Sequence, residues 1–514
     1  MDFNARGGTD LWLRNDGGGY AAYDNVSVTQ IGSVAHALNY SSASGYSEIT
    51  SALSGSGKVT VNAGAGGLTL WRANSYSGGT EVNGGTLYVA GAGTLGDAAG
   101  GITISNTGST ATLDLRNQQT RTGTISMIGQ GARLTSGDGN GSLINNGSAF
   151  EMGGGQITVS LSGTGGLNVT GGGVINSSNS YTGATTISGT TGWYGTHTFY
   201  VVNANALGAA SADLALSGGI VSLMNNTITR SGNLTISGGQ VHTGTISKSG
   251  GDYDIQGGQI DAVLAGTSGL TKSGLNQAVL TSANTYSGTT AVNAGTLKVF
   301  SGGSIVSSST VNNGGTLDVA GTAGNVQLNN GGTLKGSGTI SALTVASGGT
   351  LAPGNSTGIL NTGSTTFLGG GNYDWEIDTF GGGVVGTNWD SLNIAGDLTI
   401  SANSGSQFII DVISLLSSTD TAGLASNFSD GTNYSFAIAT ASGTISGYAA
   451  NAFSINTSAF QNSFTGTWGT SLSNDGKSLN LTYTAATAIP EPTSSLLLLT
   501  SLGLLGLRRR FFRK

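Results

Sequence analysis

The chain of 514 residues has no cysteine, only three prolines, and charged residues at just 8% of its length. Without cysteine it can form no disulfide, no thiolate nucleophile and no zinc–thiolate site. Ordinary globular chains carry about 25% charged residues and about 7% glycine, whereas this chain contains 91 glycines. The composition therefore predicts a turn-rich fold.

The few charges are also unevenly distributed. The net charge is −7, yet five of the 18 basic residues lie among the last seven positions, at Arg508, Arg509, Arg510, Arg513 and Lys514. The rest of the chain thus contains 13 basic and 25 acidic residues. Such a body repels phosphate backbones, so we expect no nucleic-acid partner.

The abundant residue types favour strands over helices. Glycine costs about 1 kcal/mol relative to alanine inside a helix, and Thr, Ser, Asn and Val are mediocre helix formers. Val and Thr suit β-strands instead. Hydrophobic residues make up 37% of the chain, more than a flexible linker would carry, so the sequence predicts short strands joined by tight turns.

Internal repeats indicate how these short strands are arranged. Residues 68–89 and 278–299 are identical at 13 of 22 positions, and Asn74, Asn179 and Asn284 follow one another at intervals of 105 residues. Gly-Gly-Thr-Leu begins at 314, 331 and 348, at steps of 17 residues. Periods of this size indicate a solenoid. A coil of about 17 to 22 residues closes one rung of three short strands, which predicts a parallel β-helix.

Asparagines precede the Gly-Thr-Leu step in several copies, at Asn83, Asn293, Asn313 and Asn330. Two interpretations stay open. Stacked asparagines can form a hydrogen-bonded ladder along a solenoid, or the residues can simply occupy turns, because Asn tolerates positive φ.

The repeat residues resemble a known family. Asn74-Ser75-Tyr76-Ser77-Gly78 and the corresponding segment 284–288 are similar to units of the autotransporter-associated β-strand repeat family, and residues 348–354 look like the last rungs of such passenger regions. The resemblance covers roughly residues 50 to 400 and implies a right-handed β-helix exposed outside the cell.

Four regions follow from these patterns. We expect a truncated N-terminal β segment or cap at 1–46, parallel β-helix repeats at 47–400, terminal coils with a β-rich cap at 401–487, and a sorting signal at 488–514. An uncapped solenoid would expose an aggregation-prone edge, which is why a cap is expected. The first thirty residues lack an apolar signal segment, so we expect the exported protein to begin upstream of Met1.

The tail carries the sharpest motif. Pro490, Glu491 and Pro492 precede an apolar run at 496–507, which is followed by Arg508, Arg509 and Arg510. This order resembles a PEP-CTERM sorting signal. The resemblance implies a single short transmembrane helix, cleavage by an exosortase-type membrane protease, transient residence in the inner membrane, and delivery to the cell surface or extracellular matrix. A permanent tail anchor is the alternative.

Two acidic clusters are candidates for a catalytic or a cation-binding site. Asp374, Glu376 and Asp378 are predicted on one strand face, at a spacing that inverting glycosidases also use. The other cluster comprises Asp252, Asp254 and Asp261, whose oxygens suit a divalent cation. An outward polar face without a chemical role is the ordinary explanation of such clusters.

We therefore predict an exported structural or adhesive surface protein that is not an enzyme and carries no cofactor or metal. A carbohydrate-active or carbohydrate-binding β-helix, with extracellular polysaccharide as ligand, is the alternative.

Overall fold

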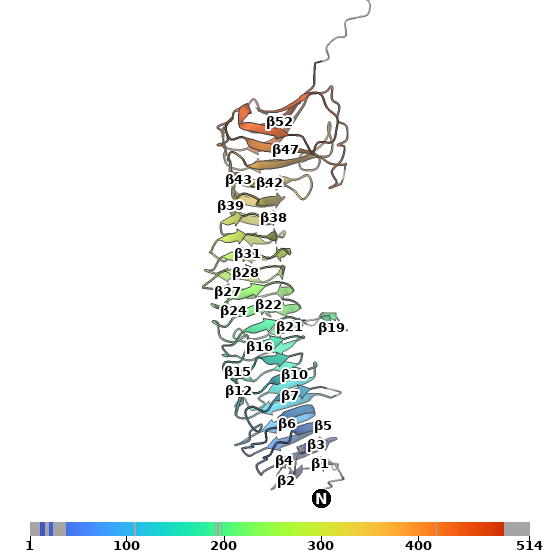
Figure 1. The fold of residues 1–514 in the computed structure, drawn as a ribbon, viewed down its shortest axis with the longest axis vertical. Helices are drawn as coiled ribbons and strands as arrows, with labels where there is room; N and C mark the ends of the chain where they lie inside the picture. The colour runs from blue at the N-terminus through green and yellow to red at the C-terminus, as the bar shows by residue number, and fades with distance from the viewer. Residues whose placement is uncertain are drawn as a thin grey trace, which may run out of the picture.

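The computed structural model describes residues 38–487, with short gaps at 107–108, 190, 193–194, 197 and 418, together with the backbone of 11–15 and 20–23. Figure 1 shows an elongated, gently bowed stack of short strands that ends in a wider C-terminal region. We call the stack the shaft and the wider end, formed by residues 368–487, the cap. The described chain is all-β, as predicted, and its one helical turn is η1 (Ala450–Ala452).

Each coil of the shaft contributes strands to two long faces. Face A includes β35 (Gly295–Val299), β38 (Gly315–Val319), β40 (Thr333–Gly336) and β42 (Thr350–Pro353), and it continues into the cap as β44 (Asn372–Ile377) and β47 (Phe408–Ser414). Face B includes β7 (Ile102–Ser105), β10 (Ile125–Ile128), β18 (Thr185–Ile187), β28 (Tyr253–Ile255), β31 (Leu270–Lys272), β34 (Thr290–Val292) and β37 (Ser309–Val311). The long strand β6 (Thr80–Val89) crosses from face B, where it pairs with β7, to face A. Neighbouring coils pair in parallel register. The parallel β-solenoid is therefore confirmed.

A third side, face C, closes the coil less continuously. It consists of two separate three-stranded sheets and, nearer the cap, of strands that bend around the corner from face B. The separate sheets are β9 (Gln118–Arg121), β12 (Ser142–Asn145) and β15 (Ser160–Ser162), and β24 (Thr227–Arg230), β27 (Thr245–Lys248) and β30 (Val263–Gly266). The strands that turn the corner are β39 (Thr322–Leu328), β41 (Thr339–Val345) and β43 (Ile359–Phe367).

The 17-residue period is the length of one coil. Leu317 pairs with Leu334, which pairs with Leu351, and the preceding coil places Leu297 on Leu317. All four leucines are fully buried. A leucine column therefore fills the interior behind face A, and a slip of one residue would turn the column to solvent.

The 105-residue period is five coils. Successive pairings lead from Val82 through one residue in each coil to Ile187. The same number of pairings leads from Ile187 to Val292. The three copies of the Asn-x-Tyr motif are therefore placed at the same position of every fifth coil.

The cap ends the parallel stack with antiparallel strands. β48 (Tyr434–Ala441) pairs antiparallel with β52 (Ser478–Thr484), which pairs with β51 (Thr467–Leu472). An aromatic cluster fills the cap, and Phe380 lies at its centre with ring centroids of five neighbours 4.9 to 6.5 Å away, those of Phe428, Tyr434, Phe436, Phe460 and Trp468. The hairpin of β51 and β52 covers the edge of β48, which would otherwise be exposed.

A carboxylate fastens the end of the cap. Asp430 accepts hydrogen bonds from the Thr465 backbone N–H and hydroxyl, both at 2.7 Å, and from the Tyr483 hydroxyl. These bonds lower the pKa of Asp430 to about 2. The loop before β51 is thereby tied to β52.

In the part of the chain that the structure describes, no helix is long and apolar enough to cross a membrane. The predicted membrane segment and sorting signal at 488–514, including Pro490, Glu491, Pro492 and Arg508–Arg510, lie outside the described residues.

Candidate functional site

The repeated asparagines are interior clamps between three coils. Asn284 is 1% exposed, its Oδ1 accepts the Leu264 N–H of the preceding coil at 2.9 Å, and its Nδ2 donates to the Ser304 carbonyl of the next at 3.0 Å. Asn74 and Asn179 make the same pair of bonds to their own neighbouring coils. Each side chain thus satisfies buried backbone groups that would otherwise lack partners.

A tyrosine two residues later locks the same coil. The Tyr76, Tyr181 and Tyr286 rings are buried, and each hydroxyl hydrogen-bonds the threonine four residues on at 2.6 to 2.8 Å. Burial raises the pKa of each tyrosine to about 12. The ring fills the core, and the polar tip closes the turn.

The motif glycine is required by close approach. A Cβ atom on Gly78, Gly183 or Gly288 would lie 2.3 to 2.5 Å from backbone atoms of the coil beneath. Real Cβ atoms do not come this close to backbone, so no other residue type fits without moving a coil. The asparagine and the glycine of the motif therefore serve coil stacking, and the tyrosine closes the turn of its own coil.

Four buried cations were not expected from the sequence. Arg121, Arg230, Lys248 and Lys272 are at most 2% exposed. Their side chains donate to backbone carbonyls at coil corners, as Arg230 does to Leu207 at 2.7 Å and Lys272 does to Ala294 at 2.9 Å. Burial lowers the pKa of all four. The sequence gives a weak signal at Lys272, which pairs in register with the buried apolar residues Ile255 and Val292 of the neighbouring coils.

An asparagine ladder runs along the outside of three coils. Asn312 donates to the Asn293 Oδ1 and Asn329 donates to the Asn312 Oδ1, both at 2.7 Å. The ladder prediction is confirmed for Asn293, but its further members are Asn312 and Asn329. Asn313 and Asn330 instead stand one position before the positive-φ glycines of their turns, in agreement with the turn interpretation.

The acidic segment of β44 only partly matches its prediction. Trp375 and Ile377 are fully buried while Asp374 and Glu376 face outward, as expected from the alternation. Asp378 does not share their face. It lies beyond the end of β44, is 5% exposed, and accepts the Asn388 side-chain N–H at 2.8 Å. The strand ends one residue too early for three carboxylates to align.

Like charges and burial disfavour ionisation on this part of face A. Asp374 pairs in register with Asp411 on β47, and burial together with that neighbouring charge raises the pKa of Asp374 to about 6. Burial raises the pKa of Glu376, and the Lys335 charge partly offsets the shift. Asp390, which the sequence did not single out, is fully buried, and burial holds its pKa well above the usual range.

The second acidic cluster is not one site. Asp252 and Asp254 line a groove of about 460 Å³ beside Asp213. Asp261 lies away from them on face A, where it accepts hydrogen bonds from Gln259 at 2.8 Å and Thr281 at 2.7 Å. The strand register separates the three carboxylates because residues 252 and 254 belong to face B.

Over the described ranges, no group of three or more His, Asp or Glu side chains is arranged to hold a metal ion. The groove beside Asp252 and Asp254 is lined by Ala184, Asp213, Leu214, Ala215, Asn233, Leu234 and Thr235 in addition to these two. This lining contains neither an aromatic ring nor a basic side chain. The arrangement thus lacks the aromatic walls and basic partner that a polysaccharide-cleaving cleft would combine with carboxylates.

Comparisons with known proteins agree with the repeat resemblance. The passenger-associated transport repeat family model matches residues 61–89 and 270–299, which contain the two full motif copies. The chain is also similar to the adhesin BmaC autotransporter of Brucella suis biovar 1 (strain 1330), with 29% identity over 250 residues. That match covers 46% of this chain and 7% of the adhesin. The described solenoid is thus autotransporter-passenger-like.

One solved structure also aligns with the chain. It is the TibC-catalysed hyper-glycosylated TibA55-350 fragment, which is 20% identical to this chain. The alignment covers 78% of this chain and 98% of the fragment, with a TM-score of 0.21.

Proposed function

We propose that this protein is an exported structural or adhesive component of the cell surface or extracellular matrix, without enzymatic activity. The observation that carries the proposal is the repeat itself. Passenger-type motifs recur at the same coil position, and their repeated Asn, Tyr and Gly residues stack or close coils rather than lining a catalytic cleft. A solenoid built this way holds an extended surface away from the cell.

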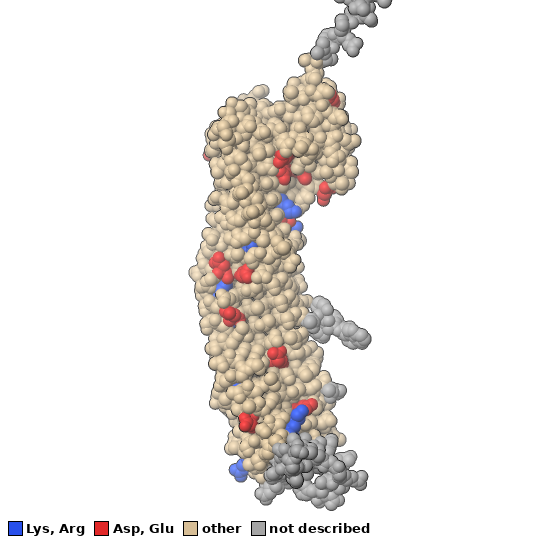
Figure 2. Space-filling model, viewed as in Figure 1, with Lys and Arg blue, Asp and Glu red and all other residues tan. Residues whose placement is uncertain are grey.

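The outer surface supports a binding or structural role. Figure 2 shows a mostly uncharged shaft with scattered acidic and basic groups on the face in view. The asparagine ladder and the polar corner residues give that surface many neutral donors and acceptors. The similarity to an adhesin over 250 residues points in the same direction.

We further propose that residues 488–514 act as a removable sorting signal. Proline removes a backbone donor and keeps its predecessor extended, so Pro490-Glu491-Pro492 would form an accessible junction before the apolar segment. The arginines at 508–510 would stay cytoplasmic by the positive-inside rule. An exosortase-type protease would then cleave near the junction on the outer side of the inner membrane and release the shaft to the surface.

The sorting proposal is tested by measuring the intact mass of the protein recovered from the envelope and the medium. We expect the wild-type protein to be shortened by about two to three kDa, the mass of a removed targeting segment. Changing Pro490, Glu491 and Pro492 together to alanine should leave full-length protein in the inner membrane. A surface-localised protein that still ends at Lys514 would show a permanent anchor instead.

A further inference from the structure

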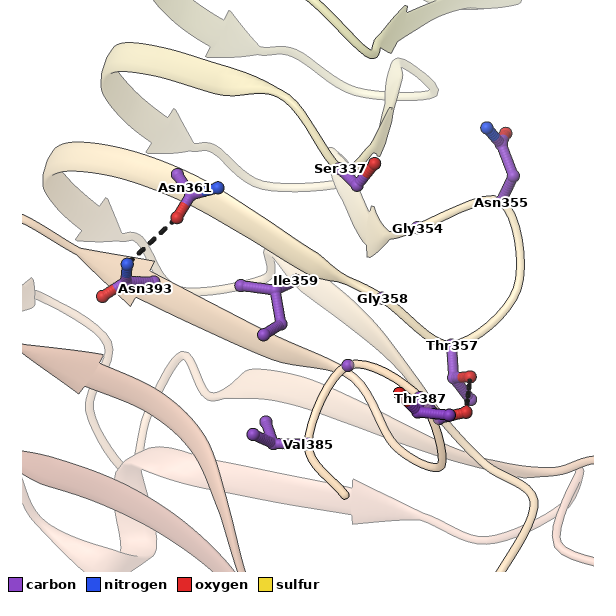
Figure 3. Close-up of a pocket in the computed structure, with 11 residues that line it drawn as sticks. Ser337, Gly354, Asn355, Thr357, Gly358, Ile359, Asn361, Val385, Thr387 and Asn393 are labelled. Atoms are coloured by element: carbon purple, nitrogen blue, oxygen red, sulfur yellow. Dashed lines mark hydrogen bonds between the residues drawn. The ribbon is translucent and has the colours of Figure 1, made fainter. Parts of the chain in front are cut away.

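A groove of about 680 Å³ lies where the shaft meets the cap. Figure 3 shows that its walls come from the turn after β42, the start of β43, the loop before β45 (Ser391–Ile394), and β45 itself. Eleven residues line it: Ser337, Gly354, Asn355, Thr357, Gly358, Ile359, Asn361, Val385, Gly386, Thr387 and Asn393. The volume lies within the range of about 300 to 1,000 Å³ that ligand pockets occupy.

The two lips of the groove are fastened to each other. Buried Asp390 accepts the Gly358 N–H at 2.7 Å and the Glu376 N–H at 3.0 Å, and the Thr357 hydroxyl donates to the Thr387 carbonyl at 2.6 Å (Figure 3). Because these bonds are internal to the protein, the groove keeps its shape without a ligand. Such preorganisation lowers the entropy that binding must overcome.

The lining is polar but uncharged. It contains three side-chain amides, three hydroxyls and two aliphatic side chains, and no Asp, Glu, Lys, Arg or His. Figure 3 shows the hydrogen-bonded pair Asn361 and Asn393 on one side, the contact between Thr357 and Thr387 on another, and Ile359 and Val385 between them. Asn361 and Asn393 are 3.0 Å apart in this contact, and each side-chain amide still has hydrogen-bonding capacity for a ligand.

We propose that this groove binds an uncharged sugar segment of an extracellular polysaccharide. A neutral sugar presents hydroxyls that both donate and accept hydrogen bonds, which amides and hydroxyls match, and apolar C–H faces, which Ile359 and Val385 match. An anionic polysaccharide would require a basic side chain to pair with its carboxylates, and the lining has none. The inference rests on the proposed surface function, since the ligand lies outside the cell.

The test uses the full-length chain and two matched tryptophan variants. Val385 lines the groove and is 40% exposed, whereas its neighbour Val384 is 60% exposed and does not line it. Val385→Trp should therefore fill the groove, and Val384→Trp should place the same ring outside it. Asn393→Ala removes one amide of the polar wall without adding volume. Circular dichroism and thermal unfolding establish that each variant keeps its fold.

Binding is measured by isothermal titration with neutral dextran, galactomannan and xyloglucan, and with anionic alginate and polygalacturonate. We expect at least one neutral polymer to bind wild type and Val384→Trp equally, Val385→Trp to weaken that binding by about tenfold or more, and Asn393→Ala to weaken it less. Binding of only the anionic polymers, equal binding by Val385→Trp and Val384→Trp, or no binding of any neutral polymer would overturn the proposal. Surface delivery is measured separately, so a failed titration leaves the proposed localisation standing.

Discussion

The shaft and the cap are stabilised in different ways. In the shaft, a buried residue touches its own coil and the coils directly above and below, as Asn284 does through Leu264 and Ser304. In the cap, Phe380 packs against Trp468, which lies 88 positions further along the chain. Shaft stability is therefore a sum of neighbouring contacts, while the cap depends on one shared cluster. The contacts of the shaft repeat from coil to coil, so its sequence repeats as well. The aromatic cluster of the cap occurs once and produces no repeat in the sequence.

The largest expected effect is on the cap. Phe380→Ala removes the ring that contacts five other aromatic rings and should lower the free energy of unfolding by about 3–5 kcal/mol. The loss should appear as early unfolding of 368–487 in hydrogen exchange, with the shaft near residue 200 still protected. Phe300→Ala is the control because Phe300 is 50% exposed, and it should change stability by about 0.5 kcal/mol or less. Equal effects of the two variants would remove the distinction.

An intermediate effect is expected from an interior clamp of the shaft. Asn284→Ala leaves the buried Leu264 N–H without its acceptor and should lower the free energy of unfolding by about 2–3 kcal/mol. The exposed Asn293 is the matched control, and Asn293→Ala should cost about 0.5 kcal/mol or less. Denaturant unfolding gives both values, and hydrogen exchange should place the loss in the coils around 264 and 304. Loss of protection throughout the cap would contradict nearest-neighbour stacking.

The smallest effect is a pH dependence of opposite sign at two carboxylates of the cap, Asp374 on β44 where face A enters the cap and Asp430 at the far end. The Asp374 pKa is raised to about 6 on folding, so stability should fall as pH rises from about 4 to 6. The Asp430 pKa is lowered to about 2, so its contribution is present above about pH 4 and is lost as pH falls towards 2. Asp374→Asn should flatten stability over the first window and Asp430→Asn over the second. Stability is measured by thermal unfolding at a series of pH values. If Asp374→Asn instead changed the pH dependence below pH 4, or Asp430→Asn changed it between pH 4 and 6, these assignments would be wrong.

Repeats made the shaft readable from sequence. Because Leu317, Leu334 and Leu351 occupy one column, their spacing gave the coil length directly. The motif residues Asn284 and Tyr286 were visible as repeats, but their roles as clamps depend on backbone groups a coil away.

Other features left no readable pattern. Arg230 pairs with Lys248 one coil later, but its carbonyl partners are brought to it only by stacking. Strand alternation correctly placed Asp374 and Glu376 outward, yet the end of β44 at Ile377 is set by the cap loop that holds Asp378. The groove beside Ile359 could not be predicted, because its two lips come from separate loops joined through Asp390.

The central claim, that the shaft faces the outside of the cell, is most directly tested by single-cysteine labelling. The chain has no cysteine, so one introduced thiol is the only site for a membrane-impermeant maleimide. Leu275 is 88% exposed and Leu280 is fully buried. We predict that Leu275→Cys is labelled on intact cells as fully as after lysis, and that Leu280→Cys is labelled only after denaturation. Labelling of Leu275→Cys that requires lysis would contradict a surface location.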